Sequence, residues 1–190
     1  MKNVQHPLKL ILKSKNWNNF EKNISKYHET YQGEYFEYLC IFILQTNPIY
    51  KNIKKIWNYR KKEVPKDVLD YLHLPNEDEG IDLIAETADK KYWSIQCKYH
   101  SDPNYVLRRP KLSTFFELSF FVGKNIDFAL VLSSAGSYSY KYKKLKYPQD
   151  KIGFQLNNFF SKSDQSYFNK VHNLINNKKT ILKKIPKAKH

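Results

Sequence analysis

Apolar residues follow helical spacing in some segments of the chain and strand-like spacing in others. In residues 34–46 they recur at i, i+3, i+4, i+7 and i+8, which predicts a core-facing helix. Gly33 precedes this segment, and the Asn-Pro pair at 47–48 is expected to end it. Helical spacing also predicts a second helix over 111–123, with Gly123 as its C-cap.

Other segments have the composition of strands. Residues 52–60, 81–86 and 91–98 are predicted strands, and the last two form a hairpin. Residues 126–134 are a nearly continuous apolar run, typical of a central strand buried on both faces, and a short strand is expected at 152–156. This order predicts an α/β protein in which helices flank a mixed sheet.

The two ends of the chain are expected to lie outside this core. Residues 1–30 are polar and weakly amphipathic, which predicts an N-terminal helical lead-in. A further helix is expected near 164–177, and residues 179–190 are predicted to form a basic tail or linker. The domain itself is predicted to span residues 31–178.

Length and composition favour one folded domain. The chain has 190 residues, of which 41% are hydrophobic and 16% aromatic, and this excludes a disordered protein. No apolar run approaches the roughly 18 residues that span a membrane, and the N-terminus lacks a convincing secretory leader. Cys40 and Cys97 are the only cysteines, which fits a reducing compartment. We therefore expect a cytoplasmic protein with no membrane partner.

The net charge of the chain is strongly positive. There are 33 Lys and Arg against 18 Asp and Glu, a net charge of +15. Such an excess favours a polyanionic partner, because binding to phosphates releases condensed counterions. Arginine contributes only Arg60, Arg108 and Arg109, and an AT-rich genome would also enrich lysine. Charge alone does not say whether a nucleic acid is cut or merely bound.

Three polar residues of the predicted hairpin share one face. If the turn is centred near residues 88–90, the numbers of opposed residues add to about 178 or 180. Either sum sets Asp82 opposite Gln96 or Lys98, with all three on one face, whereas an odd sum would turn Asp82 away. A carboxylate and an amide oxygen suit a hard cation such as Mg²⁺. The alternative is a surface ion pair between Asp82 and Lys98.

A helical carboxylate falls on an apolar face. With 100° per residue, Glu37 lies about 100° from Phe36, beside Leu44 and within the buried arc of the first predicted helix. Glu34 lies further out and is the better candidate for a solvated residue. A buried carboxylate is costly unless it is paired or ligates a metal, so Glu37 is a candidate site residue.

These motifs together resemble a known nuclease family. The segments QGEYFEYL at 32–39, DEGIDLIA at 78–85 and SIQCKY at 94–99 resemble the Mrr-like branch of the PD-(D/E)XK nuclease superfamily. They are most similar to the N-terminal nuclease domains of helicase-fused restriction enzymes such as the type ISP class. The resemblance runs from about Gly33 to Ser134. It implies a restriction-endonuclease-like three-layer sandwich with an αβββαβ core.

The resemblance also implies a role for each site residue. Asp82 matches the central metal-binding aspartate, and Gln96 stands where most of the superfamily has Asp or Glu. Lys98 matches the lysine that orients or activates the attacking water. Glu37 matches the helix glutamate that completes the site through a metal-bound water, and the Cys97 main-chain carbonyl would be a further ligand. The implied cofactor is Mg²⁺, with Mn²⁺ as a substitute.

Two groups of cations are candidates for contacts with the DNA backbone. Arg108, Arg109 and Lys111 are expected to open the second helix, whose N-terminal amides could take a phosphate. Lys141, Lys143 and Lys144 lie in a loop that interleaves tyrosines with lysines. The alternatives are plain solubility for the first group and a solvated loop for the second.

The sequence therefore predicts a Mg²⁺-dependent DNA endonuclease of a restriction, defence or DNA-processing system. Its expected partners are DNA and a fused or separate helicase or translocase, and double-strand cleavage would require a dimer. Gln96 is neutral, so the site has one anion fewer than the Asp/Glu version. This leaves open a DNA-binding module that retains the nuclease fold without cleaving. A third alternative is a structural protein whose lysines reflect only genomic bias.

Overall fold

All five strands predicted from the sequence are present in the computed structural model, which describes residues 6–77, 80–139 and 148–184. They form one sheet in the order β1-β2-β3-β5-β7. The strands are β1 (Ile53–Asn58), β2 (Leu83–Thr87), β3 (Tyr92–Lys98), β5 (Ile126–Ser133) and β7 (Ile152–Gln155). β1, β2 and β3 are antiparallel neighbours, whereas β3, β5 and β7 run parallel. The sheet is therefore mixed, as predicted.

The hairpin of β2 and β3 has one of the two registers considered from the sequence. Leu83 pairs with Ile95, so the opposed residue numbers have an even sum. The recorded pairing ends at Leu83, one residue after Asp82. The even register predicted for the hairpin is confirmed.

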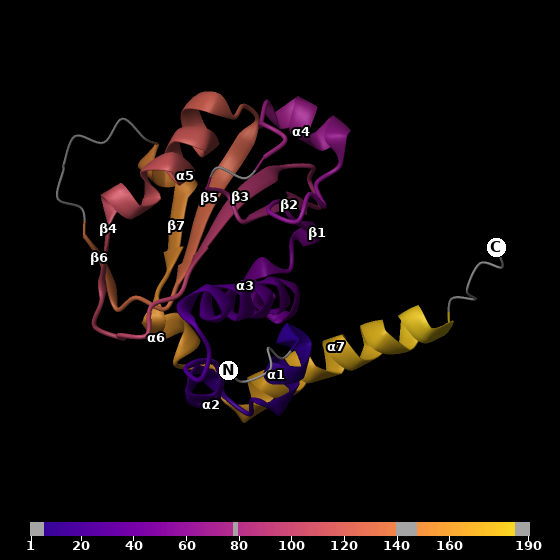
Figure 1. Ribbon diagram of the computed structural model, residues 1–190. Coiled ribbons are helices and arrows are strands. Elements are labelled where there is room, and N and C mark those ends of the chain that lie inside the picture. The colour runs from indigo at the N-terminus through magenta and orange to yellow at the C-terminus, as the bar shows by residue number, and fades with distance from the viewer. Residues whose placement is uncertain (1–5, 78–79, 140–147, 185–190) are drawn as a thin grey trace.

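Helices cover both faces of the sheet and make three layers (Figure 1). α3 (Glu29–Thr46) packs on one face, where it contacts β3 and β1. α4 (Lys66–Leu72) and α5 (Ser113–Glu117) belong to a second apolar cluster on the other face. β5 lies between the two clusters, since Leu130 packs in the first and Val131 in the second. This explains why its sequence is apolar at almost every position.

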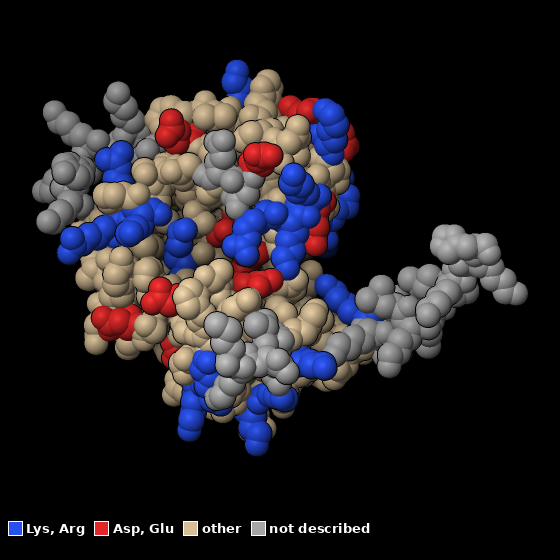
Figure 2. Space-filling view, viewed as in Figure 1, with Lys and Arg blue, Asp and Glu red and all other residues tan. Residues whose placement is uncertain are grey.

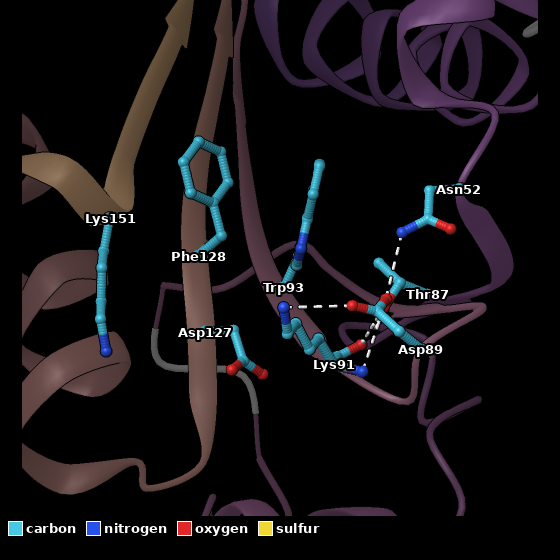
Figure 3. Close-up of a pocket in the computed structure, with 8 residues that line it drawn as sticks. All are labelled: Asn52, Thr87, Asp89, Lys91, Trp93, Asp127, Phe128 and Lys151. Carbon is cyan, nitrogen blue, oxygen red and sulfur yellow. Dashed lines mark hydrogen bonds and ion pairs between the residues drawn. The ribbon is translucent and has the colours of Figure 1, made fainter.

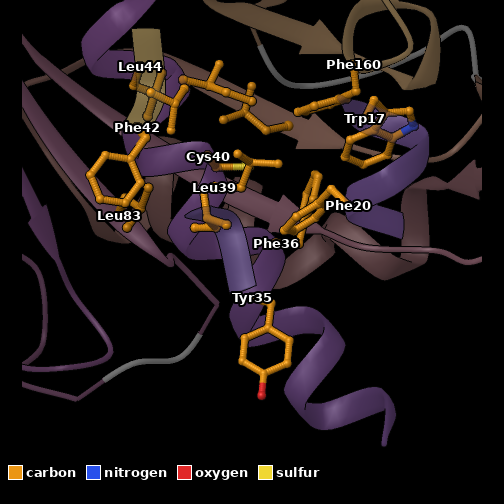
Figure 4. Packing of buried hydrophobic residues seen from close by; sticks show 14 of the residues in the cluster. Trp17, Phe20, Tyr35, Phe36, Leu39, Cys40, Phe42, Leu44, Leu83 and Phe160 are labelled. Carbon is orange, nitrogen blue, oxygen red and sulfur yellow. The ribbon is translucent and has the colours of Figure 1, made fainter. Parts of the chain in front are cut away.

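Both ends of the described chain pack against α3. α1 (Pro7–Lys13), α2 (Trp17–Ile24) and α7 (Gln165–Lys184) all contact this helix. Aromatic rings gather where α2 and α6 (Asn157–Phe160) meet α3 (Figure 4). There the ring centroid of Phe160 lies 5.2 Å from that of Trp17 and 5.1 Å from that of Phe36. α3 is thus held on two sides, which fixes the helix that carries Glu37.

Two predicted helix boundaries are wrong. α3 begins at Glu29, not at residue 34, and contains Gly33 in its interior. A single glycine costs a helix only about 1 kcal/mol, and the packing of α3 outweighs this cost. The helix expected near 164–177 likewise continues to Lys184.

The helix predicted over 111–123 is broken into three pieces. A 3₁₀ turn at Arg109–Leu112 leads into α5, and a π-helical turn follows at Leu118–Val122. Gly123 is not a left-handed C-cap, because its φ is −67°. Its N–H instead donates to the Leu118 carbonyl at 2.7 Å, and an added Cβ would collide with that carbonyl. Close approach of the backbone, not backbone dihedral freedom, requires glycine here.

Several short elements have no counterpart among the predicted ones. Three of them are α4 and two strands that form a separate parallel pair, β4 (Val106–Arg108) and β6 (Ser137–Ser139). None of the three exceeds seven residues, which is too short for a clear period. Within the described ranges, no helix has the length and apolar character needed to cross a membrane.

Candidate functional site

Asp82 lies one residue before β2, between β1 and β3. Its backbone N–H donates to the Ile95 carbonyl at 3.0 Å, and its own carbonyl accepts from the Tyr59 N–H at 2.9 Å. Both neighbouring strands therefore hold the Asp82 backbone. The sheet ladder fixes the position of this carboxylate even though the residue stands outside the regular strand.

The side chain of Asp82 extends the pairing between β2 and β3. Its Oδ2 accepts from the Gln96 amide nitrogen at 2.5 Å and from the Cys97 backbone N–H at 2.6 Å. Asp82 is only 9% exposed and Gln96 only 3%. A buried carboxylate that accepts two hydrogen bonds differs from a solvent-exposed cross-strand ion pair, which was the alternative considered for Asp82.

Glu37 of α3 is the second buried acid, with 3% exposure. Its Oε1 accepts a hydrogen bond from the Asn58 side-chain amide, and its Oε2 lies 4.0 Å from an Arg60 guanidinium nitrogen. Burial and the nearby charge of Asp82 raise the pKa of Glu37 to about 7, against the lowering effects of Arg60, Asn58 and Lys61. The two carboxylates therefore repel each other across a poorly hydrated site.

The turn after β1 supplies two site residues that the sequence did not indicate, Asn58 and Arg60. Asn58 pairs with Leu83 in the sheet, and its side-chain oxygen accepts from the Lys61 N–H at 2.9 Å. Its own N–H donates to Glu63 at 3.0 Å. This turn is therefore rigid beside Glu37. The apolar pattern of β1 does not indicate these two site residues, because α3 and β1 are separate segments of the sequence and their contact depends on the tertiary fold.

Lys98 ends β3, two residues after Gln96 and on the same face. It pairs with Ser133 of β5, and its carbonyl accepts from the Ser133 hydroxyl at 2.8 Å. The Lys98 ammonium also lowers the pKa of His100 beyond the end of the strand. The sheet thus places Lys98 at the end where Asp82 and Gln96 meet.

The side chain of Cys97 points into the core, as predicted. It packs against the apolar cluster that includes Cys40 of α3. The two thiols contact each other, and burial raises the pKa of both. Of the groups of Cys97, the main-chain carbonyl therefore remains the candidate metal ligand.

The donor set of this site fits a hard divalent cation. Glu37 and Asp82 offer carboxylate oxygens, and Gln96 offers an amide oxygen, the ligand types that Mg²⁺ takes. Burial and the Asp82 charge raise the Glu37 pKa in spite of Arg60 and Lys61, so a bound cation would stabilise the ionised pair. Within the described ranges no three His, Cys, Asp or Glu residues are grouped to hold a metal, so the amide oxygen and main chain would have to contribute.

The candidate DNA-contacting cations stand on different elements from those expected. Arg108 is an exposed residue of β4, and Arg109 and Lys111 lie in the 3₁₀ turn. α5 begins later, at Ser113, and is too short to offer a helix-terminal phosphate site. The three loop lysines predicted to bind DNA lie outside the described residues.

A cavity of about 380 Å³ lies at the opposite end of the hairpin (Figure 3). Both of its acids are hydrogen-bonded: Asp89 accepts from Asn52 at 3.1 Å and from Thr87 at 2.7 Å, and contacts Lys91 at 3.1 Å. Asp127 accepts from the Tyr92 N–H at 2.9 Å. The pKa of Asp89 is lowered chiefly by the Thr87 hydrogen bond, whereas the pKa of Glu37 is raised. Figure 2 shows red carboxylates flanked by blue side chains at the centre of the visible face.

The fold and the paired acids define a restriction-endonuclease-like α/β protein. Residues 45–151, more than half of the chain, match the Mrr_cat_2 family, described as restriction endonuclease. The chain belongs to this family, which confirms the resemblance drawn from the sequence and supports a nuclease role. The matched segment contains Asp82, Gln96 and Lys98, whereas Glu37 precedes it.

A solved structure shares the fold. It is an ATP-dependent Type ISP restriction-modification enzyme, LlaBIII, bound to DNA, with 16% identity and a TM-score of 0.56. The alignment covers 75% of this chain but only 8% of that enzyme. At this identity the similarity shows the fold alone. No curated protein matches the chain significantly.

Proposed function

We propose that the chain is a Mg²⁺-dependent DNA endonuclease, with Mn²⁺ as a substitute, of a cytoplasmic restriction, defence or DNA-processing system. Residues 31–178 would form the nuclease domain, working with a fused or separate helicase. The observation that carries the proposal is the burial of two carboxylates, Glu37 and Asp82; burial and, after it, the charge of Asp82 raise the Glu37 pKa to about 7. Nothing in the packing of a core requires such a pair, and a cation would relieve it.

Four residues would hold the cation. Asp82 and Gln96 would bind it directly with the Cys97 carbonyl, and Glu37 would bind through water. Gln96 donates its amide nitrogen to Asp82 in the structure, so it would have to turn its oxygen toward the ion. A bound divalent ion would neutralise charge on the scissile phosphate and lower the pKa of a water molecule.

Lys98 and Arg60 would supply the remaining positive charge. Lys98, a compact charge on a long stem, would orient the attacking water and contact a phosphate oxygen. Arg60 has a side chain that is 45% exposed and lies on the rim beside Glu37, where it could contact the same phosphate. Arg108, Arg109, Lys111, Lys141, Lys143 and Lys144 would contact the backbone further away, and double-strand cleavage would require a dimer.

The proposal is tested by nicking of supercoiled plasmid in Mg²⁺ or Mn²⁺. Asp82→Ala and Lys98→Ala should each abolish cleavage while the thermal unfolding transition stays cooperative. A matched control is Lys66→Ala, which removes an exposed lysine paired only with Asp70. Cleavage that survives both site substitutions would remove the assignment.

A second candidate is a DNA-binding module that does not cleave. The neutral Gln96 favours it, because one anion fewer weakens metal binding. This module would bind DNA with no divalent ion held through Asp82, and a Mn²⁺ titration separates the two. A purely structural protein would instead show no DNA affinity at about 150 mM salt.

A further inference from the structure

A second cavity is lined by residues from 102–111, the segment of chain that joins β3 to α5. Its volume is about 510 Å³, within the range of small-ligand sites. Tyr105 and Val106 line it together with Pro110, and Arg108 and Lys111 add two cations. Val106 is 40% exposed, so an apolar surface is open to solvent between two positive charges. One acid, Asp102, also lines the cavity.

The wall that carries Tyr105 is rigid. Its ring stacks on the His100 imidazole with centroids 3.8 Å apart and planes 14° from parallel. Its carbonyl accepts from the Gly136 N–H at 3.0 Å, and a Cβ at Gly136 would collide with the Pro103 carbonyl. The aromatic surface is thus held in place by stacking and by close backbone contact.

His100 connects this cavity to the candidate site. It follows Lys98 by two residues, a distance of about 7 Å in an extended chain. Burial lowers the pKa of the His100 imidazole, and the charges of Lys98 from the site and Lys111 from the cavity lower it further. Figure 2 shows blue side chains on the side of the molecule where Figure 1 places β4, the strand of Arg108. A strand held at Lys98 would reach the cavity within a few nucleotides.

We propose that this cavity binds one unstacked nucleotide of the substrate strand, near the bond that the proposed nuclease would cut. The base would lie against Tyr105 and Val106, and its phosphate would contact Arg108, with Lys111 as a second cation on the cavity wall. Aromatic rings accept any base through stacking, and cations take the phosphate without regard to sequence. A base within a duplex is already stacked, so the cavity favours single-stranded or frayed DNA.

The test uses the full chain in EDTA, which separates binding from cleavage. Single-stranded oligonucleotides carry 2-aminopurine at successive positions, and the readouts are its fluorescence and the affinity at several salt concentrations. Binding should quench 2-aminopurine. Tyr105→Leu should remove the quench and weaken binding about tenfold, whereas Tyr105→Phe should preserve both.

Arg108→Ala tests the phosphate contact. It should lower the slope of log affinity against log salt by about 0.7, the value for one contact to a single strand. Lys170→Ala, which removes an exposed lysine of α7, should leave the slope unchanged. Equal slopes for the two variants, or a quench that persists in Tyr105→Leu, would overturn the proposal.

Two further arms keep the test decisive. If Tyr105→Leu does not fold, Val106→Asp places a repelling charge on the same wall at an exposed position and should also remove the quench. Because the proposal rests on the nuclease assignment for its location, the same samples are assayed with Mg²⁺. Cleavage without a quench removes only the nucleotide cavity, and a quench without cleavage removes only the nuclease.

Discussion

Asp82 and Glu86 lie four residues apart, one just before β2 and the other within it, and both are buried. Their surroundings differ. Glu86 contacts Lys90 at 2.6 Å and Lys55 at 3.2 Å, and the hydrogen bond from Lys90 is the main reason that its pKa is lowered. Asp82 is bound by an amide and a backbone N–H and lies near a second acid, Glu37.

The difference separates a structural acid from a candidate catalytic one. At Glu86 the protein supplies the positive charge itself, and the folded state favours the ionised carboxylate. Near Asp82 the folded state instead favours the protonated form of Glu37, because burial and a like charge outweigh Arg60 and Asn58. An acid pair left in this state is typical of functional sites, where stability is given up for chemistry.

The largest expected effect comes from neutralising each acid with its isosteric amide. Asp82→Asn should lower plasmid nicking by at least about 100-fold, because it removes a direct metal ligand. Glu86→Gln should leave nicking within about twofold and lower the free energy of unfolding by about 1–2 kcal/mol. Nicking rates measure the effect on cleavage, and urea unfolding curves measure the effect on the free energy of unfolding. Equal losses of cleavage would show that the two acids play the same role.

Glu37→Gln should stabilise the metal-free protein above neutral pH. The folded-state pKa of about 7 lies above the ordinary glutamate value of 4.5, so the folded state binds the proton more tightly than the unfolded state. Wild-type stability therefore falls as pH rises from about 4.5 to about 7, and the glutamine variant lacks this fall. We expect a difference of about 2–3 kcal/mol at pH 8 in EDTA, vanishing near pH 4.5.

Urea unfolding across this pH range measures the difference. The same variant should lose cleavage activity, so stability and activity change in opposite directions. A stability difference that does not depend on pH would contradict the burial of an ionisable Glu37.

Arg60→Ala should have an intermediate effect. Removing a cation from the rim of the site should reduce cleavage about tenfold, since one phosphate contact is lost. Arg60→Lys, which keeps the charge, should restore part of the rate. Steady-state cleavage of a short duplex measures both, with Lys66→Ala as the control. Identical rates for all variants would place Arg60 outside the site.

The smallest effect is expected at Lys90. Its side chain is 77% exposed, and Lys55 remains to pair with Glu86. Lys90→Ala should therefore lower the free energy of unfolding only slightly, and less at high salt. Thermal melts at two salt concentrations measure this loss. A loss as large as that expected for Glu86→Gln would show that the Glu86 pair is not equivalent to a surface ion pair.

Most of the strand order could be predicted from the sequence. The period of two in β2 and β3 and the apolar run of β5 are local signals, and the even register of the hairpin follows from its short turn. Helix boundaries were less predictable, because tertiary packing carries α3 through Gly33 and close backbone contacts break the helix before Gly123. β4 and β6 are three residues each and pair only through long-range contacts.

The site could be predicted only where local geometry determines it. Alternation along β3 groups Gln96 with Lys98, and the helical wheel places Glu37 on a buried face. Asn58 and Arg60 could not be found this way, because their relation to Glu37 depends on how α3 packs against β1. The catalytic and metal-binding roles of these residues stay predictions.

The most direct test counts Mn²⁺ ions bound per chain by electron paramagnetic resonance, with a short uncleavable duplex present. Wild type and Glu86→Gln should bind Mn²⁺ equally, and Asp82→Asn should bind it at least about tenfold more weakly. If Asp82→Asn binds Mn²⁺ as well as Glu86→Gln does, the acid pair is not a metal site and the nuclease mechanism proposed for it is wrong.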